Sequence, residues 1–526
     1  MNTIQAQQPA LIRSMMQPAL YGAPVEKCQL IETHISWVIL TGPYAYKIKK
    51  PVNLGFLDFS TLEKRHLYCD EEVRLNRRLA ADIYLEVVPI TGSAEQPCLA
   101  GKGEVIEYAV KMLEFPQQIQ LDRLLDAGGL QGRHIDAIAT MIADFHNNIA
   151  VADKSMVYGS PERILKPVVE NFTHIREQLG QQLETYACSP ILDALQQWSE
   201  KSFRDLRPLF AARKDGGYIR ECHGDLHLRN LAWIADAPLA FDCIEFNPDL
   251  RWIDVISEVA FLTMDLQARQ QPGLAQRFLN AYLEKTGDYA GVRVLPFYLL
   301  YRAMVRAKVD AIRACQAGIT DEEKAEAEEG LADYLRLGQS SIQPRSPRLM
   351  ITRGMSASGK TSLTQPLLEA LAALRIRSDV ERKRLFGIEA EQAAHAETGA
   401  GIYTAEATQR TYNKLAELAG DVIDAGYPVI IDATFQKYEQ RERFRQLAEA
   451  KKVPYVILEF TASAETLRQR IVSREKGASD ADLAVLEQQM KHWQPLRDDE
   501  HVHALKIDTE TAPNMSLLAE QVARMA

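Results

Sequence analysis

The stretch ECHGDLHLRNLAWIADAPLAFDCIEF, residues 221–246, concentrates polar side chains at the ends of short apolar runs. LAWI and LAFD read as two strands around the turn ADAP, because Asp and Pro interrupt the apolar pattern there. A hairpin of this kind brings Asp242 back beside Asn230. Amide and carboxylate oxygens at neighbouring strand ends are suitable ligands for Mg²⁺. Asp225, on the loop before Asn230, is placed to accept a proton from a hydroxyl that attacks a phosphoryl group.

The spacing of these residues resembles the catalytic loop of the aminoglycoside phosphotransferase and protein-kinase-like superfamily. That loop reads His-x-Asp-x-x-x-x-Asn, and a metal-binding Asp ends the next hairpin. Here His223, Asp225 and Asn230 match the loop, and Asp242 follows at the expected place. The His-Gly-Asp form is closer to the small-molecule phosphotransferases than to the protein kinases, which usually carry His-Arg-Asp. The resemblance implies that Asp225 is the catalytic base and that Asn230 and Asp242 hold the metal.

The same resemblance assigns roles to residues before the loop. It implies a strand lysine that holds the nucleotide phosphates and a helix glutamate paired with that lysine. Lys47 in YAYK is the expected lysine, with Lys49 and Lys50 as close rivals. Glu72 in DEEVRLNRRL is the expected glutamate, with Glu71 as the alternative.

Other features of the first half agree with the superfamily or depart from it. KMLEFP at 111–116 fits the hinge, where backbone groups would meet adenine. No glycine-rich loop precedes Lys47, and only Thr-Gly-Pro at 41–43 marks the turn. Asp254 in RWIDV is expected to brace the catalytic loop from the following helix, and His227 is expected to be structural.

A second pattern, LMITRGMSASGKTSL at 349–363, places Gly-x4-Gly-Lys-Thr between an apolar strand and a helix. This is a P-loop motif in the structural context that it requires. Its glycines let backbone N–H groups turn toward phosphate oxygens, and the helix N-terminus adds positive potential. Lys360 is expected to bridge the β- and γ-phosphates, and Thr361 to bind Mg²⁺. The candidate nucleotide-binding residues of the loop are Gly354, Ser356, Ala357, Ser358, Gly359, Lys360, Thr361 and Ser362.

Charged residues follow the later strands. Asp379 ends IRSD, with Arg382 three residues on, and Asp432 ends VIID. Arg470 and Arg474 stand at i and i+4 on one helical face, where they can offset charge that develops during transfer. The set resembles the small P-loop kinases, among them gluconate and shikimate kinase-like enzymes, polynucleotide 5′-kinases and zeta-type toxins. The resemblance implies that Asp379 is the base and Arg382 a substrate contact; Asp432 is a further candidate for substrate binding.

Simpler interpretations stand beside these roles. Asp379 can cap the helix that follows it. Arg470 and Arg474 can be solvated surface charges. The three arginines of QRERFRQL, residues 440–447, are expected on an exposed helix face rather than in a substrate site.

The length of 526 residues predicts more than one domain. GQSSIQPRSPR breaks the periodicity and predicts a linker at 339–347. We expect an α+β bilobal protein-kinase-like domain over 1–338, with an N-lobe at about 1–115 and a C-lobe at about 116–338. An α/β P-loop kinase domain with a parallel sheet is expected over 348–526, because strands and helices alternate there. Strands are expected at 34–40, 45–50, 84–90, 104–115, 349–352, 376–379, 427–434 and 454–460, and a long helix at 60–80.

Composition narrows the setting. The formal charge of −10 disfavours broad nonspecific binding to nucleic acid or anionic membranes. The seven cysteines include no CxxC pair, which argues against a disulfide framework or a zinc site and favours a reducing cytoplasm. No apolar run reaches about 18 residues, so no membrane span or membrane partner is expected.

These patterns predict a phosphotransferase that uses ATP, or GTP, with Mg²⁺ at two nucleotide-binding domains. It would transfer the γ-phosphoryl group to hydroxyl acceptors, with a small molecule as the first choice and nucleic acid as a further partner class for the C-terminal domain. In the alternative, the P-loop half is a polynucleotide or nucleotide-sugar kinase. The kinase-like half then selects substrate or senses ATP as a regulatory module.

Overall fold

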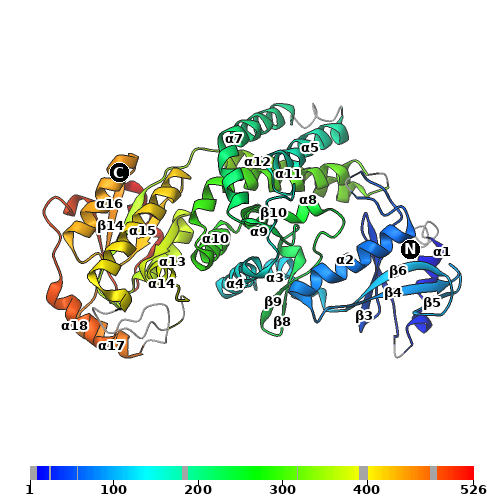
Figure 1. Ribbon diagram of the computed structural model, residues 1–526, viewed down its shortest axis with the longest axis horizontal. Helices are drawn as coiled ribbons and strands as arrows, with labels where there is room; N and C mark the ends of the chain where they lie inside the picture. Colours follow the sequence, from blue (N-terminus) through cyan, green and yellow to red (C-terminus); the bar gives the residue numbers. More distant parts are fainter. Residues whose placement is uncertain are drawn as a thin grey trace. The chain divides into compact units, whose positions relative to one another are not determined.

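The computed structural model describes residues 9–22, 25–55, 57–180, 188–316, 318–389, 392, 401–473 and 482–525. By backbone packing the chain divides into two compact units, which are described separately. The first unit comprises Met1–Ala137, Asp144–Pro167 and Arg207–Leu262, and the second comprises Ile138–Ala143, Val168–Leu206 and Thr263–Ala526. Figure 1 labels the elements along the chain. None of the helices in the described residues is long and apolar enough to cross a membrane.

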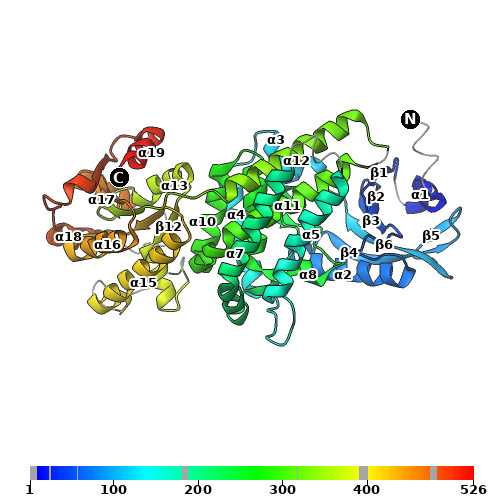
Figure 2. The ribbon, with the colours of Figure 1, turned by 90° about the horizontal axis from the view of Figure 1, so that it is seen from above.

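The first unit is built on a six-stranded antiparallel sheet in the order β1-β2-β3-β6-β4-β5. Its strands are Gln29–Glu32 (β1), Ser36–Leu40 (β2), Tyr44–Lys49 (β3), Tyr84–Gly92 (β4), Pro97–Leu99 (β5) and Val105–Leu113 (β6). Helices α1 (Ala10–Met15) and α2 (Leu62–Ala80) lie on opposite faces of this sheet (Figure 2). Because side chains alternate along a strand, Ala45, Lys47 and Lys49 all face α2.

The predicted long helix is present, and its start has a local cause. Thr61 is the N-cap, with its side chain accepting a hydrogen bond from the Lys64 N–H, so α2 begins at Leu62.

The hairpin that follows the catalytic-loop sequence is formed by Leu231–Ile234 (β8) and Ala237–Ala240 (β9). Ala235 and Asp236 both have positive φ, 49° and 61°, which is the backbone of a tight two-residue turn. The prediction that the second strand runs to Asp242 was wrong. The strand ends at Ala240, and Asp242 lies beyond it in left-handed backbone with φ 64°.

Helices and two short strands complete the part of the chain before residue 272. They are α3 (Leu121–Asp126), α4 (Gly132–Asn148), α5 (Pro161–Leu179), α7 (Ser189–Asp215), β7 (Ile219–Glu221), α8 (Pro248–Arg251), β10 (Trp252–Asp254) and α9 (Val255–Ala268). Strands β7 and β10 pair antiparallel and flank the catalytic-loop sequence.

The second unit contains a five-stranded, all-parallel sheet in the order β12-β13-β11-β14-β15. Its strands are Leu349–Arg353 (β11), Leu374–Arg377 (β12), Val429–Asp432 (β13), Tyr455–Thr461 (β14) and Ala504–Asp508 (β15). The last of these was not predicted; it is an edge strand with little buried apolar surface. Strand β11, by contrast, is central and wholly buried.

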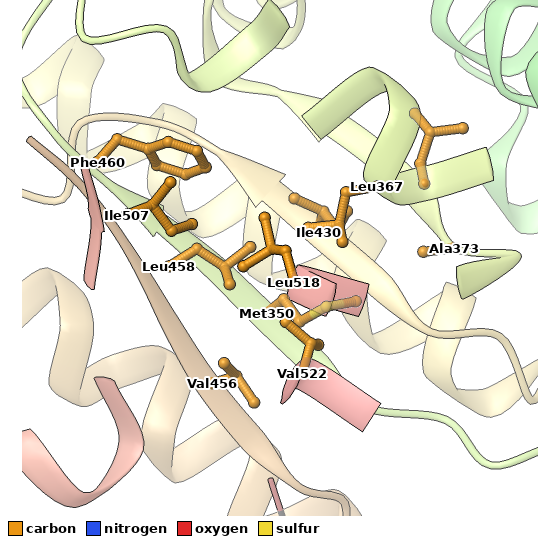
Figure 3. Packing of buried hydrophobic residues seen from close by; sticks show 11 residues of the cluster. Met350, Leu367, Ala373, Ile430, Val456, Leu458, Phe460, Ile507, Leu518 and Val522 are labelled. Atoms are coloured by element: carbon orange, nitrogen blue, oxygen red, sulfur yellow. The ribbon is translucent and has the colours of Figure 1, made fainter. Parts of the chain in front are cut away.

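The core of this sheet is packed from both the strands and the helices. In Figure 3, Leu518 and Val522 of α19 (Met515–Arg524) lie against Met350 and Leu458 of the sheet. The helices of the second unit from residue 272 onward are α10 (Pro272–Thr286), α11 (Leu295–Ala314), α12 (Asp321–Ser341), α13 (Lys360–Leu371), α14 (Ser378–Leu385), α15 (Ala405–Asp424), α16 (Tyr438–Lys451), α17 (Ala464–Ser473), α18 (Leu483–His492) and α19.

Two boundaries differ from those expected. Helix α12 continues to Ser341, so the first three residues of the predicted linker 339–347 are helical. Strand β12 ends at Arg377, and Asp379 therefore lies in the first turn of α14 rather than at the end of a strand.

Candidate functional sites

The first candidate site begins with a lysine and glutamate pair between β3 and α2. The Nζ of Lys47 lies 2.8 Å from Oε1 of Glu72 and 2.5 Å from Oδ1 of Asp242. The structure thus brings together three side chains predicted from segments far apart in the sequence. The rival Lys50 pairs instead with Glu32, and the alternative Glu71 pairs with Arg74 on its own helix.

Lys49 shares the same glutamate from a more enclosed position. Its Nζ lies 2.6 Å from Oε2 of Glu72 and also contacts Glu245. The Lys49 side chain is 1% exposed, whereas that of Lys47 is 12% exposed and faces the half-exposed Asp242. Sequence reasoning missed Glu245, which lies three residues beyond Asp242 in FDCIEF.

The opposite charges in this cluster keep each other ionised. Burial raises the pKa of Glu72, but Lys47 and Lys49 outweigh it and lower that pKa to about 2. Burial opposes the charged form of Lys47, while Asp242 and Glu72 raise its pKa well above the ordinary value. Glu72 and Lys47 are therefore both ionised at neutral pH.

A buried glutamate on α9 holds the backbone of the catalytic loop. The carboxylate of Glu258 accepts hydrogen bonds from the N–H of His223 at 3.0 Å and of Gly224 at 2.6 Å, and its Oε1 lies 3.0 Å from Nε2 of His146. Gly224 has φ 90°, and a Cβ there would lie 2.8 Å from the carbonyl oxygen of Leu250, so only glycine fits the turn.

The expectation that Asp254 braces this loop was wrong. Its carboxylate pairs with Arg213 at 2.7 and 2.8 Å and caps α9 at the Ile256 N–H. Glu258, one helical turn later, takes the bracing position. A single carboxylate within the apolar run VISEVAFL was the sequence signal for it.

The imidazole of His223 links the loop to the hairpin. Its Nε2 donates to the carbonyl of Phe241 at 2.8 Å, while Nδ1 accepts the N–H of Asp225 at 3.3 Å. Burial lowers the pKa of His223. A neutral ring with its proton on Nε2 satisfies both contacts.

Asp225 is surrounded by groups that fix its carboxylate. The amide of Asn230 donates to Oδ2 of Asp225 at 3.0 Å, and Nε2 of His227 lies 3.3 Å from the same oxygen. His227, expected to be structural, thus also contacts the predicted base. The backbone bond from the Phe241 N–H to the Asn230 carbonyl, at 3.0 Å, places Asn230 next to the residue preceding Asp242. An amide and a half-exposed carboxylate in this position fit Mg²⁺.

The second candidate site is the loop between β11 and α13. A Cβ on Gly354 would lie 2.4 Å from Ser358 Oγ and 2.9 Å from the Phe460 carbonyl oxygen, so the turn excludes a side chain there. Gly359, with φ 84°, is the N-cap residue of α13. Among the described residues, the buried Ser358 hydroxyl has no hydrogen-bond partner. A loop of this shape directs N–H groups and a helix N-terminus toward one point, which suits a phosphate.

Lys360 and Thr361 follow the loop into the helix. The Nζ of Lys360 donates to the carbonyls of Gly354 and Met355 at 2.9 and 2.8 Å. The hydroxyl of Thr361 donates to Oδ2 of Asp432 at 2.6 Å. Asp432, a candidate for substrate binding, therefore lies against the predicted metal ligand, and a hydroxyl beside a carboxylate suits Mg²⁺.

A cavity of about 1370 Å³ opens beside the loop. Lys360, Thr361, Asp379, Arg382 and Asp432 all line it, together with the loop residues Ser356, Ala357, Ser358, Gly359 and Ser362. The site residues predicted from separate strands are thus brought to one space.

Arg382 is buried at the wall of this cavity. Its Nη1 donates to the Ile402 carbonyl at 2.9 Å and to Thr408 Oγ1 at 3.3 Å, and its guanidinium lies over the ring of Tyr403. Its Nε has no hydrogen-bond partner among the residues that the structure describes.

Arg470 contacts the loop from α17. It donates to the Thr509 carbonyl at 2.6 Å and to the Ala357 carbonyl at 3.4 Å, so it is not a freely solvated charge. Arg474 lies outside the described residues. Sequence reasoning missed Gln489 of α18, whose Oε1 accepts the N–H of Ser356 at 2.8 Å.

The predicted exposed face of QRERFRQL was wrong for Arg441. That guanidinium is buried and pairs with Glu500, with Nε 2.6 Å from Oε1. Arg443 lines the cavity, and Arg445 pairs with Glu442 on its own helix.

Comparison with known families agrees with this division of sites. Residues 61–295 match the model described as phosphotransferase enzyme family, and residues 349–496 match the model described as AAA domain. The chain joins a domain that matches a phosphotransferase family to a P-loop domain that matches the AAA-domain model. The first site lies mainly in the phosphotransferase domain, with Lys47 contributed from residues before the matched range. The second lies in the P-loop domain.

Two curated relatives match most of the length of the chain. Uncharacterized proteins of Mycobacterium tuberculosis and Mycobacterium bovis are 29% identical over 450 residues, covering 86% of this chain and 87% of theirs. Among solved structures, an amicoumacin kinase in complex with AMP-PNP and Ca²⁺ is 14% identical with a TM-score of 0.40, covering 65% of this chain and 97% of its own. A putative kinase of Chloroflexus aurantiacus is 21% identical with a TM-score of 0.29, covering 35% of this chain and 100% of its own.

Proposed function

We propose that the protein is a phosphotransferase with two sites for ATP, or GTP, and Mg²⁺, each of which transfers the γ-phosphoryl group to a hydroxyl acceptor. The observation that carries the proposal is the contact of Thr361 with Asp432, 2.6 Å apart at the end of the P-loop. The same cavity is lined by the carboxylate of Asp379 and by the buried cation Arg382. Phosphate cradle, metal ligands, base and acceptor contact are then available in one space.

In the P-loop domain, the residues divide the work by position. Thr361 and Asp432 would hold the metal, which supplies charge neutralisation at the phosphate oxygens. Lys360 would leave the carbonyls of Gly354 and Met355 to bind phosphate. Asp379 would take the proton of the acceptor hydroxyl as its oxygen bonds to phosphorus and the bond to the departing nucleoside diphosphate breaks.

In the phosphotransferase domain, Asp225 would accept the proton of a second acceptor. The amide of Asn230 and the contact with His227 hold its carboxylate in one orientation. Lys47 would contact phosphates while Glu72 keeps it charged and in place. Asn230 and Asp242 would hold the metal.

The test is to follow labelled phosphate from γ-labelled ATP incubated with cell extract, and to separate small metabolites, nucleic acid and protein. We expect label in the small-molecule pool. Asp225→Ala and Lys360→Ala should each remove a distinct labelled product. The proposal that each domain phosphorylates a small molecule would be contradicted if neither variant changed the labelling, or if label entered nucleic acid alone.

A second candidate function is favoured by one observation in the first unit. Strands β1 and β2, which precede the lysine strand β3, are joined by only Thr33, His34 and Ile35, where kinases place a glycine-rich cover over the phosphates. Lys47 also already contacts Asp242. The phosphotransferase domain would then respond to nucleotide without transferring phosphate. This function would be favoured if Lys360→Ala lost all ATP consumption while Asp225→Ala consumed ATP as the parent does.

A further inference from the structure

The outer edge of the parallel sheet is covered by polar side chains from residues before the P-loop domain. Strand β12 is one of the two edge strands, so its outer N–H and C=O groups need partners. Asn280 of α10 accepts the N–H of Arg375 at 2.6 Å, and Gln276 donates to the Ala373 carbonyl at 2.7 Å. The hydroxyl of Tyr289 donates to the Arg375 carbonyl at 3.2 Å. All of these residues belong to the second unit, although α10 lies within the sequence matched by the phosphotransferase family.

One residue of this contact reaches beyond the strand edge. Oε1 of Glu284, in the last turn of α10, lies 2.8 Å from Nη1 of Arg377, and its Oε2 lies 3.6 Å from Nη2 of Arg375. The backbone carbonyl of Glu284 also accepts a hydrogen bond from Arg384 of α14. Glu284 thus contacts both arginines of β12 and the helix that carries Asp379.

The two arginines contact different parts of the P-loop site. Arg375 is buried, and its Nη1 donates to the backbone carbonyl of Thr361 at 2.8 Å and to Thr364 Oγ1 at 3.2 Å. Arg377 lines the cavity together with Asp379 and Asp432. A carboxylate that fixes both guanidinium groups therefore acts on the backbone of the metal ligand and on the acceptor wall.

We propose that Glu284 is a positioning residue of the P-loop site, acting through Arg375 on Thr361 and through Arg377 on the wall beside Asp379 and Asp432. The proposal rests on the function proposed for that site. Under this proposal helix α10 contributes to the P-loop site, although it lies within the sequence matched by the phosphotransferase family.

A purely structural role for the helix contact makes a different prediction, and the chain offers a matched control. Arg277 of α10 pairs with Glu369 of α13 at 3.0 Å, in the same contact and with similar exposure. Neither residue lines the cavity. Arg277→Gln removes an ion pair between the helix and the P-loop domain and leaves both contacts of Glu284 with the arginines in place. Glu369 is linked to Arg375 through the side chain of Gln365, one step further away.

The experiment uses the full chain and measures the binding of ADP by calorimetry, once in the presence of Mg²⁺ and once in its absence. The P-loop component is the part lost in Lys360→Ala. Glu284→Gln is expected to weaken the Mg²⁺-dependent part of that component about tenfold, as for residues that orient metal ligands. Glu284→Asp should recover part of the loss. Arg277→Gln should bind as the parent does and melt at the same temperature as Glu284→Gln.

Several results would overturn the role of Glu284. One is that Glu284→Gln binds Mg·ADP as tightly as Arg277→Gln does, while Lys360→Ala has lost the P-loop component of binding. In that case the proposed function of the site stands and only the role of Glu284 is excluded. Parent-like binding in Lys360→Ala overturns both. Should Glu284→Gln fail to fold, Arg377→Gln tests the same proposal, because Glu284 still pairs with Arg375 in that variant. It should lower P-loop ATP turnover with Mg·ADP affinity unchanged, and parent-like turnover would contradict the proposal.

Discussion

Thr361 and Asp432 lie 71 residues apart in sequence, and the hydroxyl of one donates to the carboxylate of the other at 2.6 Å. The order of the sheet explains the contact. Strands β11 and β13 are parallel neighbours, so their carboxyl ends meet at the same edge. Thr361 follows the first strand through the P-loop, and Asp432 ends the second.

Asp432→Asn should reduce the Mg²⁺-dependent affinity for nucleotide at least about tenfold, because an amide is a weaker ligand or anchor than a carboxylate. ATP titration with and without Mg²⁺ measures this. Asp424→Asn, which alters an exposed pair with Lys451, serves as the control. An unchanged Mg²⁺ dependence in Asp432→Asn would exclude the metal-binding role.

Asp225→Asn should reduce phosphoryl transfer by the phosphotransferase domain by about 10²- to 10⁴-fold, the usual contribution of a general base. Folding should be unaffected, because Asn can keep the contact with Asn230. The measurement is product formation in a Lys360→Ala background, where only this domain transfers phosphate. Asp153→Asn, an exposed change in the same unit, should leave product formation intact.

Lys49→Met should lower the free energy of unfolding by about 3–5 kcal/mol, since it leaves Glu72 and Glu245 buried with one cation fewer. Lys50→Met removes an ion pair with the half-exposed Glu32 and should cost at most about 1 kcal/mol. Urea unfolding compares the two. Equal stability of both variants would show that the buried cluster does not depend on Lys49.

Glu258→Gln should destabilise the protein in a pH-dependent manner. Burial raises the pKa of Glu258, but His146, His223 and the Gly224 N–H outweigh it and lower the pKa to about 2 from 4.5. A lowered pKa contributes stability that is fully present above pH 4.5 and is lost as the pH falls toward 2. The deficit of the variant should therefore be largest at neutral pH, on the order of 3 kcal/mol, and shrink in acid.

Urea unfolding at neutral pH and at about pH 3, where more than half of the contribution should be lost, measures that difference. Glu86→Gln, which alters an exposed pair with Lys111, should show no such pH dependence. A deficit that stays constant with pH would mean that shape rather than charge gives Glu258 its role.

Local sequence was sufficient where one short segment carries the whole signal. The P-loop, the hairpin after Asn230 and the helix over α2 were all predicted from spacing and turn residues, and the two-domain fold follows from them. The bilobal kinase-like and parallel P-loop folds expected from these patterns agree with the antiparallel and parallel sheets observed.

Residues that act through tertiary contacts were beyond that reasoning. Glu258, Glu245 and Gln489 have partners 34, 196 and 133 residues away, and nothing in their immediate neighbours specifies those partners. Arg441 was misjudged for the same reason, because its burial depends on Glu500 rather than on the pattern of its own helix. Strand ends shifted where the backbone changes conformation soon after the strand, since Asp242 has positive φ and α14 begins at Ser378.

The polar cover on β12 bears on how the protein should be divided for study. A recombinant fragment cut at residue 348 would lose Gln276, Asn280 and Tyr289, and would expose the outer edge of β12 to solvent and to other copies of itself. Self-association of such a fragment would reflect the cut rather than the native molecule. A fragment that starts before α10 keeps these groups.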